Sequence, residues 1–217
     1  MKGIIFDMDG VLVDSMPAHV RSWRSAFAEI AGITVSERDI YILEGMRGME
    51  LITKIFEQGG VTDGSLASRV HERKNRIFKS IRSSKPFEGV PEMIDELECA
   101  KAVVSGSTRT DIEAIIKEGF GQEKFSTIVS ADDIHRGKPD PSAFLAALSR
   151  MGLLPSDAVV VENAPLGVQA AKNAGIEYFI ALNNTPLRRE DFGPTIPDDR
   201  IFERTSSLSE TLRGMCK

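Results

Sequence analysis

Five short, uninterrupted apolar runs constrain the fold of this chain more than any other feature. They do not alternate with polar residues, which is typical of strands that are covered on both faces of a sheet. The runs are Gly3–Phe6, Ala102–Val104, Thr127–Val129, Ala158–Val161 and Tyr178–Leu182. Segments of helical length separate the last four, at Thr108–Lys117, Pro141–Met151 and Leu166–Asn173. Strands that alternate with helices predict an α/β fold with a doubly wound, parallel sheet.

The connection between the first two runs is much longer than the others. Roughly 90 residues lie between Val13 and Ala102, which is too long for one crossover helix and too long for an unstructured loop. Most of this segment has a helical pattern, at His19–Ile30, Glu50–Glu57, Leu66–Ile81 and Val90–Glu98. We therefore expect a helical unit, residues 15–80, inserted into a core made of residues 1–14 and 81–217.

The composition excludes some classes of protein. The chain has 217 residues, enough for a core and a small second domain, and its formal charge of −5 does not favour a nucleic-acid partner. No run of about 18 apolar residues occurs, so a membrane span is not expected. Cys99 and Cys216 are too few for a disulfide framework, which favours a reducing compartment and hence a cytoplasmic location.

Two carboxylates follow the first apolar run, in the stretch Phe6–Gly10. Side chains two residues apart in a strand share a face, so Asp7 and Asp9 can point together at the carboxyl end of the strand, where ligands bind in open α/β sheets. A calcium loop is excluded because position twelve, counted from Asp7, is Ala18 rather than Glu. An Asp-Gly hairpin turn would disturb the parallel order of strands, yet from this stretch alone it is as well supported as a site.

The ends of the other runs carry further polar groups. These are Ser105-Gly106-Ser107, Gly137-Lys138-Pro139-Asp140-Pro141 and Glu162-Asn163-Ala164-Pro165. Each alone is typical of a helix cap or a solvated turn. Together, at four strand ends of one sheet, they predict one crevice suited to phosphoryl transfer through an aspartyl phosphate. Clustered carboxylates and a phosphate need a lysine and a divalent cation nearby, and oxygen-only donors favour Mg²⁺.

In these four motifs the chain resembles the haloacid dehalogenase superfamily, in the branch of phosphatases and phosphomutases that carry a helical cap. The motifs are Asp7–Gly10, Ser105–Ser107, Gly137–Pro141 and Val159–Gly167. The resemblance implies a Rossmann-like core, with residues 15–80 as the cap domain. It also implies roles: Asp7 as nucleophile, Asp9 as general acid and base, Ser105, Gly106, Ser107 and Lys138 as binders of the transferring phosphoryl group, and Asp7, the Asp9 carbonyl, Glu162 and Asn163 as ligands of Mg²⁺.

Two positions in the motifs refine that expectation. Relatives that dehalogenate haloacids or cleave phosphonates look different at the position of Asp9, so this residue favours phosphate-ester chemistry. Asn163 stands where the superfamily commonly has a second carboxylate. Because Asn keeps an oxygen donor but lacks the charge, we expect a weaker affinity for Mg²⁺.

The inserted unit offers candidate substrate contacts. His19 and Trp23 are four residues apart, on one face of a helix, and are most simply a packed pair, while Arg47 and Lys74 are most simply solvated charges. The similarity to β-phosphoglucomutases implies instead that His19 gates Asp9. It also implies that Arg47 and Lys74 reach the substrate sugar or its non-transferring phosphate.

The expected function is that of a Mg²⁺-dependent phosphatase of small phosphorylated metabolites, a sugar phosphate above all. One alternative is a phosphomutase of the β-phosphoglucomutase type. Another is a non-catalytic binding protein that uses the same fold, which the weaker metal site at Asn163 suggests. The second is ranked low because Asp7, Asp9, Ser105 and Lys138 are all present. The expected partner is the metabolite alone, without nucleic acid or membrane. We expect a monomer or a weak homodimer.

Overall fold

A single parallel sheet forms the centre of the computed structural model, which describes residues 1–121 and 123–216. Its strands follow the order β3-β2-β1-β4-β5-β6. They are β1 (Gly3–Asp7), β2 (Ala100–Val104), β3 (Thr127–Val129), β4 (Ala158–Glu162), β5 (Glu177–Ala181) and β6 (Ile201–Phe202). All pairs are parallel. The predicted α/β class and five strands are confirmed, whereas the two-residue β6 was not predicted.

Helices cover both faces of the sheet, as the continuous apolar strands require. Ile4 and Phe6 of β1 pack with one group of helices, and Ile5, which points the other way, packs with a second group. The first group is α5 (Val90–Glu96), α6 (Arg109–Gly119) and α9 (Ser209–Met215), and the second is α7 (Ser142–Met151) and α8 (Pro165–Asn173). Five short 3₁₀-helices connect these elements: η1 (Ala131–Asp133), η2 (Pro155–Asp157), η3 (Arg189–Phe192), η4 (Asp198–Arg200) and η5 (Thr205–Leu208).

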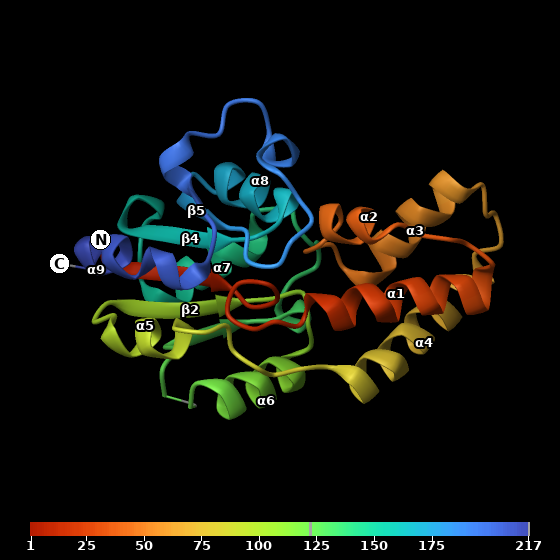
Figure 1. Cartoon of the computed structure of the whole chain (residues 1–217), viewed down its shortest axis with the longest axis horizontal. Helices are drawn as coiled ribbons and strands as arrows, with labels where there is room; N and C mark the ends of the chain where they lie inside the picture. Colours follow the sequence, from red (N-terminus) through yellow and green to blue (C-terminus); the bar gives the residue numbers. More distant parts are fainter. Residues whose placement is uncertain (122, 217) are drawn as a thin grey trace.

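The inserted unit is helical and lies beyond one end of the sheet (Figure 1). It consists of α1 (Met16–Ala31), α2 (Glu37–Ile42), α3 (Gly48–Gly59) and α4 (Ser65–Ile81). Its helices enclose apolar side chains that include Trp23, Phe27, Ile52 and Phe56. Helix α2 was not predicted, because six residues are too few to show a helical period. We refer to residues 15–80 as the cap and keep the predicted domain boundaries as a proposal.

The chain after β1 turns sharply towards the cap without forming a hairpin. The backbone carbonyl of Met8 accepts hydrogen bonds from the amides of Val11, Leu12 and Val13, and both neighbours of β1 in the sheet are parallel strands. The hairpin alternative is therefore wrong. The turn leaves the parallel order intact and leads directly into α1.

The two ends of the described chain lie together, on the side away from the cap (Figure 1). The Met1 ammonium donates a hydrogen bond to the Met215 carbonyl. Cys99 and Cys216 form a disulfide, which joins α9 to the residue before β2 and which the sequence analysis did not expect. Among the described residues, no helix has both the length and the apolar character that a membrane span requires.

Candidate active site

A cavity of about 520 Å³ lies between the carboxyl ends of the strands and the cap. The core lines it with Asp7, Asp9, Gly106, Ser107, Thr108 and Asp111, among others. The cap contributes His19, Trp23, Glu44, Arg47, Lys74 and Phe78, among others. The cavity therefore joins the first two motifs to the candidate cap residues.

Asp7, the last residue of the central strand β1, is the most enclosed carboxylate facing this cavity. It is 5% exposed, and the Lys138 ammonium binds its Oδ1. Burial, with the nearby charges of Glu162 and Asp9, raises the pKa of Asp7 well above its usual value, against the lowering effect of Lys138. Of the two carboxylate oxygens of Asp7, only Oδ1 accepts a side-chain hydrogen bond from the described residues. Oδ2 is therefore the oxygen available for attack on an electrophile.

Glu162, at the end of β4, holds Lys138 against Asp7. Its Oε1 binds the Lys138 ammonium, and its Oε2 accepts hydrogen bonds from the backbone amides of Asn163 and Ala164, at 2.9 and 3.0 Å. Burial lowers the pKa of Lys138, but Asp7 and Glu162 outweigh it and raise that pKa above its usual value. A Cβ at Gly167 would lie 1.9 Å from Glu162 Oε1, so only glycine leaves room for this carboxylate. Both oxygens of Glu162 are thus already engaged.

Asp9 is held by three side chains. Ser15 Oγ donates to Oδ1, Ser105 Oγ donates to Oδ2 at 3.0 Å, and His19 Nε2 lies 3.2 Å from Oδ1. Burial raises the pKa of Asp9, but His19 and the two hydroxyls lower it to about 2, so the carboxylate is ionised at neutral pH. Burial lowers the pKa of His19 below 6.5, despite the opposing charge of Asp9. Ser15 stands at the start of α1 and gives its hydroxyl to Asp9 rather than to the helix; sequence reasoning missed it.

The motif Ser105–Ser107 forms the loop between β2 and α6. Ser105 is 3% exposed, and its Oγ accepts a hydrogen bond from the Ser107 amide at 3.1 Å. Thr108 caps α6 by accepting the Asp111 amide. The loop therefore presents small side chains and backbone amides at a helix start, an arrangement suited to phosphate oxygens.

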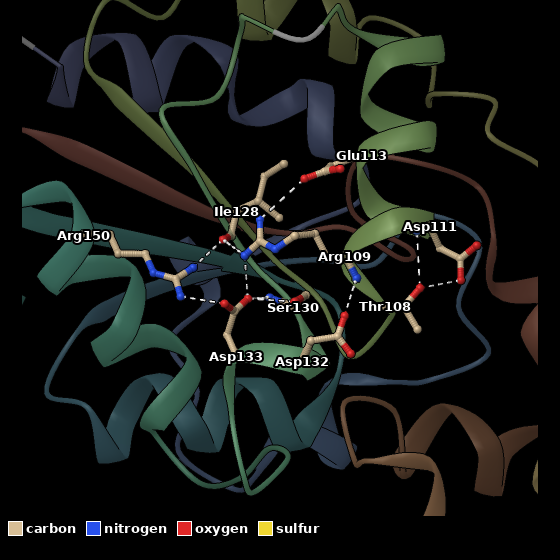
Figure 2. Close-up of polar contacts among 9 residues, drawn as sticks. All are labelled: Thr108, Arg109, Asp111, Glu113, Ile128, Ser130, Asp132, Asp133 and Arg150. Atoms are coloured by element: carbon tan, nitrogen blue, oxygen red, sulfur yellow. Dashed lines mark hydrogen bonds and ion pairs between the residues drawn. The ribbon is translucent and has the colours of Figure 1, made fainter.

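A charged network ties this loop to the segment that follows β3 (Figure 2). The Arg109 amide donates to Asp132, and the Arg109 and Arg150 guanidiniums both bind Asp133, each at 2.7 Å. Burial raises the pKa of Asp133, but the hydrogen bonds from Arg150 and Ser130 and the charge of Arg109 lower it well below its usual value. The network fixes the positions of two of the strand-end loops. No sequence signal identified it, because its members come from three separate segments.

The cap side of the cavity includes a group of rings, with the buried cation of Lys74 against two of them. Lys74 Nζ lies 5.2 Å from the ring centroid of Trp23 and 4.6 Å from that of Phe78. Burial lowers the pKa of Lys74 to about 8, although Asp9 and Asp111 oppose the shift. The His19 ring lies against that of Phe78, with centroids 4.1 Å apart and planes tilted by 32°, and the Trp23 ring stacks with Phe27 and His71. The simple reading of a solvated Lys74 is therefore wrong, because this residue is 9% exposed. The reading of a packed His19–Trp23 pair stays a prediction.

The loop between α2 and α3 docks the cap on the core. The Lys138 amide donates to the Gly45 carbonyl at 3.0 Å, and the Arg47 guanidinium donates to the His135 carbonyl at 2.7 Å. Arg47 is thus bound to the core rather than being a solvated charge. It also lines the cavity, and its predicted contact with substrate stays a prediction.

Asn163, in the fourth motif, contacts a residue that sequence reasoning did not identify. Its Nδ2 donates to Oε2 of Glu44, in the cap loop, at 3.0 Å. Burial and the charges of Asp7, Glu162 and Asp9 raise the pKa of Glu44 well above its usual value. Asn163 Oδ1 and Glu44 Oε1 are buried, and neither has a hydrogen-bond partner among the described residues.

These oxygens bear on whether the site fits a cation. Within the described residues, no three His, Cys, Asp or Glu side chains group as a metal site. The donors that the motifs bring together instead include the Asn163 amide oxygen, which is buried and has no hydrogen-bond partner within residues 1–121 and 123–216. Hard oxygen donors of this kind suit Mg²⁺. The residues present therefore fit the predicted ion.

Comparisons with known proteins show the family of this chain. Residues 4–181 match the haloacid dehalogenase-like hydrolase family. The phosphorylated carbohydrates phosphatase of Thermotoga maritima is 32% identical over 182 residues, covering 82% of this chain and 83% of that protein. The β-phosphoglucomutase of Bacillus subtilis is 30% identical over 219 residues, covering 96% and 92%.

A solved structure supports the same assignment. A Bacteroides vulgatus protein, provisionally assigned as a β-phosphoglucomutase, has a TM-score of 0.86 and is 29% identical, with 100% of this chain and 90% of that chain covered. The match spans the cap as well as the core. This chain is an enzyme of the haloacid dehalogenase superfamily, in the β-phosphoglucomutase-like branch of phosphatases and phosphomutases.

Proposed function

We propose that the protein is a Mg²⁺-dependent phosphatase of small sugar phosphates that works through a phosphorylated Asp7. The observation that carries the proposal is that Asp7 lines the cavity with Oδ1 bound to Lys138, while Oδ2 accepts no side-chain hydrogen bond from the described residues. Phosphatases of phosphorylated carbohydrates and of fructose 1-phosphate, from Thermotoga maritima and Escherichia coli, are among its relatives.

In the first step, Asp7 Oδ2 attacks the phosphorus atom and the bond to the sugar oxygen breaks. Asp9 gives its proton to that leaving oxygen. The substrate-free carboxylate is ionised, but a phosphate dianion beside it raises its pKa and favours the protonated form. Ser105, the amides of Gly106 and Ser107, and Lys138 hold the transferring phosphoryl oxygens.

In the second step, water attacks the phosphorus atom of the phosphorylated Asp7. Asp9, now ionised, takes a proton from that water, the bond to Asp7 breaks, and inorganic phosphate leaves. His19, next to Asp9, orients the carboxylate for both transfers. The docked cap limits access of bulk water to the cavity.

Asp7, the Asp9 carbonyl, Glu162 and Asn163 are the residues proposed to hold Mg²⁺. The bound ion would neutralise charge on the phosphoryl oxygens and on the clustered carboxylates. Of these ligands, Asn163 has a side-chain oxygen without a hydrogen-bond partner in the described part of the chain. Glu162 also orients Lys138, because its Oε1 binds the Lys138 ammonium while its Oε2 accepts from two backbone amides.

A screen of sugar phosphates with Mg²⁺ tests this function. Wild type should release phosphate from at least one hexose, ketose or hexitol phosphate, and Asp7→Asn should lower the rate at least about a thousandfold, because the nucleophile is lost. Asp199→Asn, at an exposed carboxylate, is the matched control. If wild type released no more phosphate than Asp7→Asn, the proposed phosphatase activity would be wrong, and a phosphomutase or a binding protein would be left.

A phosphomutase is the second candidate, and the cap side of the cavity favours it. The cation of Lys74, held between two rings, is suited to a second phosphate or a sugar hydroxyl. Incubation with β-glucose 1-phosphate and a trace of glucose 1,6-bisphosphate separates the two activities. A mutase forms glucose 6-phosphate, whereas a phosphatase releases inorganic phosphate.

A further inference from the structure

Glu44 reaches the catalytic edge of the core from the cap. It precedes Gly45, whose carbonyl accepts the Lys138 amide at 3.0 Å, and lies three residues before Arg47, which binds the His135 carbonyl at 2.7 Å. These two contacts join the loop to the segment after β3. The carboxylate of Glu44 is therefore held at the core by the docked cap loop.

The carboxylate of Glu44 and the amide of Asn163 together leave two oxygens unsatisfied. Asn163 Nδ2 donates to Glu44 Oε2 at 3.0 Å. The remaining oxygens, Glu44 Oε1 and Asn163 Oδ1, are buried and unpaired within the described chain, and Asn163 as a whole is 1% exposed. Buried polar atoms in native proteins nearly always have a partner. Asn163 Oδ1 is an acceptor, and so is Glu44 Oε1 when the carboxyl is ionised, so what the ionised pair lacks is a cation or a hydrogen-bond donor.

The charges around these oxygens favour a cation. Asp7, Asp9 and Glu162 are close enough to act on Glu44 electrostatically, and Lys138 is the cation among these interacting groups. Lys138 already binds Asp7 and Glu162. A neutral donor such as water would provide the two oxygens with partners but would leave the excess of negative charge. A divalent cation would bind the oxygens and also compensate the charge.

We propose that Glu44 is a carboxylate of the divalent-cation site, supplied by the cap, and that it restores the charge that Asn163 does not provide. The inference rests on the metal dependence in the proposed function and adds a residue outside the four motifs. It also changes the expectation of a weak affinity for Mg²⁺, because the negative charge that Asn163 lacks is present on Glu44 in the cap loop. Cation binding and docking of the cap loop should then favour each other.

Calorimetric titration of the substrate-free protein with MgCl₂ tests the role of Glu44 without any turnover. Glu44→Gln keeps the shape and removes the charge, so it should weaken Mg²⁺ binding at least about tenfold. Asn163→Asp should bind Mg²⁺ more tightly than wild type. The double variant Glu44→Gln/Asn163→Asp, with the charge moved to the core, should return to within about threefold of wild type. Glu57→Gln, at an exposed cap carboxylate, is the control.

Thermal unfolding with and without MgCl₂ gives a second readout and reports whether each variant folds. The rise in melting temperature caused by Mg²⁺ should shrink in Glu44→Gln and recover in the double variant. Equal Mg²⁺ affinity in wild type and Glu44→Gln, or no recovery in the double variant, would overturn the inference.

The outcomes for the inference and for the proposed function are separable. If wild type binds Mg²⁺ and Glu44→Gln binds it weakly, but no sugar phosphate is hydrolysed, the inference stands and the proposed function fails. If wild type hydrolyses a sugar phosphate and Glu44→Gln binds Mg²⁺ normally, the inference alone fails.

Discussion

The core side and the cap side of the cavity differ in how their charged groups are held. On the core side, Asp7, Lys138 and Glu162 are almost fully buried, and each has an opposite charge in contact. On the cap side, Lys74 lies against the rings of Trp23 and Phe78. Fixed ion pairs suit a reaction whose geometry is the same for every phosphate ester, whereas a cation among aromatic rings suits recognition of the rest of the substrate. The difference predicts that core variants lose turnover and cap variants lose affinity.

Removing the core cation should have the largest effect. Lys138→Met leaves two buried carboxylates without their partner, so kcat should fall at least about 10²–10³-fold and the free energy of unfolding should decrease by about 3–5 kcal/mol. Steady-state kinetics and urea denaturation measure both quantities. Lys117→Met, at an exposed lysine of α6, is the control. If Lys138→Met changed KM and left kcat normal, the expectation that core variants lose turnover and cap variants lose affinity would be wrong.

Disturbing the contact between the two sides should have an intermediate effect. Gly45 has φ +90°, and a Cβ there would lie 2.6 Å from Lys138 Cδ, on a side chain whose ammonium is fixed at both carboxylates. Gly45→Ala should therefore lower kcat/KM by about 10²-fold through misplacement of the cap loop and Lys138.

Gly60→Ala is the matched control for that variant. Gly60 also has a positive φ, +67°, but no atom lies within 4 Å of a Cβ built there. Both variants should lose about 1 kcal/mol of stability from backbone strain, and only Gly45→Ala should lose activity. Equal kinetics in the two variants would show that the cap loop does not position the catalytic groups.

The smallest effect should come from Lys74 and should appear in KM. With a pKa of about 8, Lys74 is charged below pH 8 and loses its proton above it, so KM should rise as the pH rises through 8. Lys74→Met should raise KM about tenfold at pH 7 through loss of a charge-assisted contact, while Lys54→Met, at an exposed cap lysine, should not.

Lys74→Arg sharpens the pH test, because the guanidinium stays charged. In this variant the rise in KM above pH 8 should disappear. The charged and titratable groups that act on Lys74 or are affected by it are Asp9, Asp111, His19 and His71. Identical pH profiles of wild type and Lys74→Arg would assign the transition to another group.

The regular part of the fold could be predicted because each buried strand has its own apolar run. Because β1 and β4 are buried on both faces, their residues are apolar up to the last position of each strand. The side chains that end these strands or follow them meet at the carboxyl edge of the sheet. The two-residue β6 and the six-residue α2 are too short for a periodic signal. Their positions depend on pairing with β5 and on packing within the cap.

The candidate site was predictable only where its residues form compact motifs. Asp7, Asp9 and Lys138 could be named because strand ends of one sheet converge. Ser15 and Glu44 could not be identified, because each is an ordinary residue at a helix start or in a loop until folding brings it to Asp9 or Asn163. The same holds for the network of Arg109 and Arg150 around Asp133.

The backbone amide of Lys138 can report on opening of the cap. Its amide donates to Gly45 in the cap, while the Asp140 amide, two residues on, donates to Gly137 within the same core loop. Opening of the cap breaks the first of these hydrogen bonds and leaves the second intact. The ratio of deuterium uptake at these two amides therefore measures the equilibrium between open and closed cap, without substrate, label or turnover.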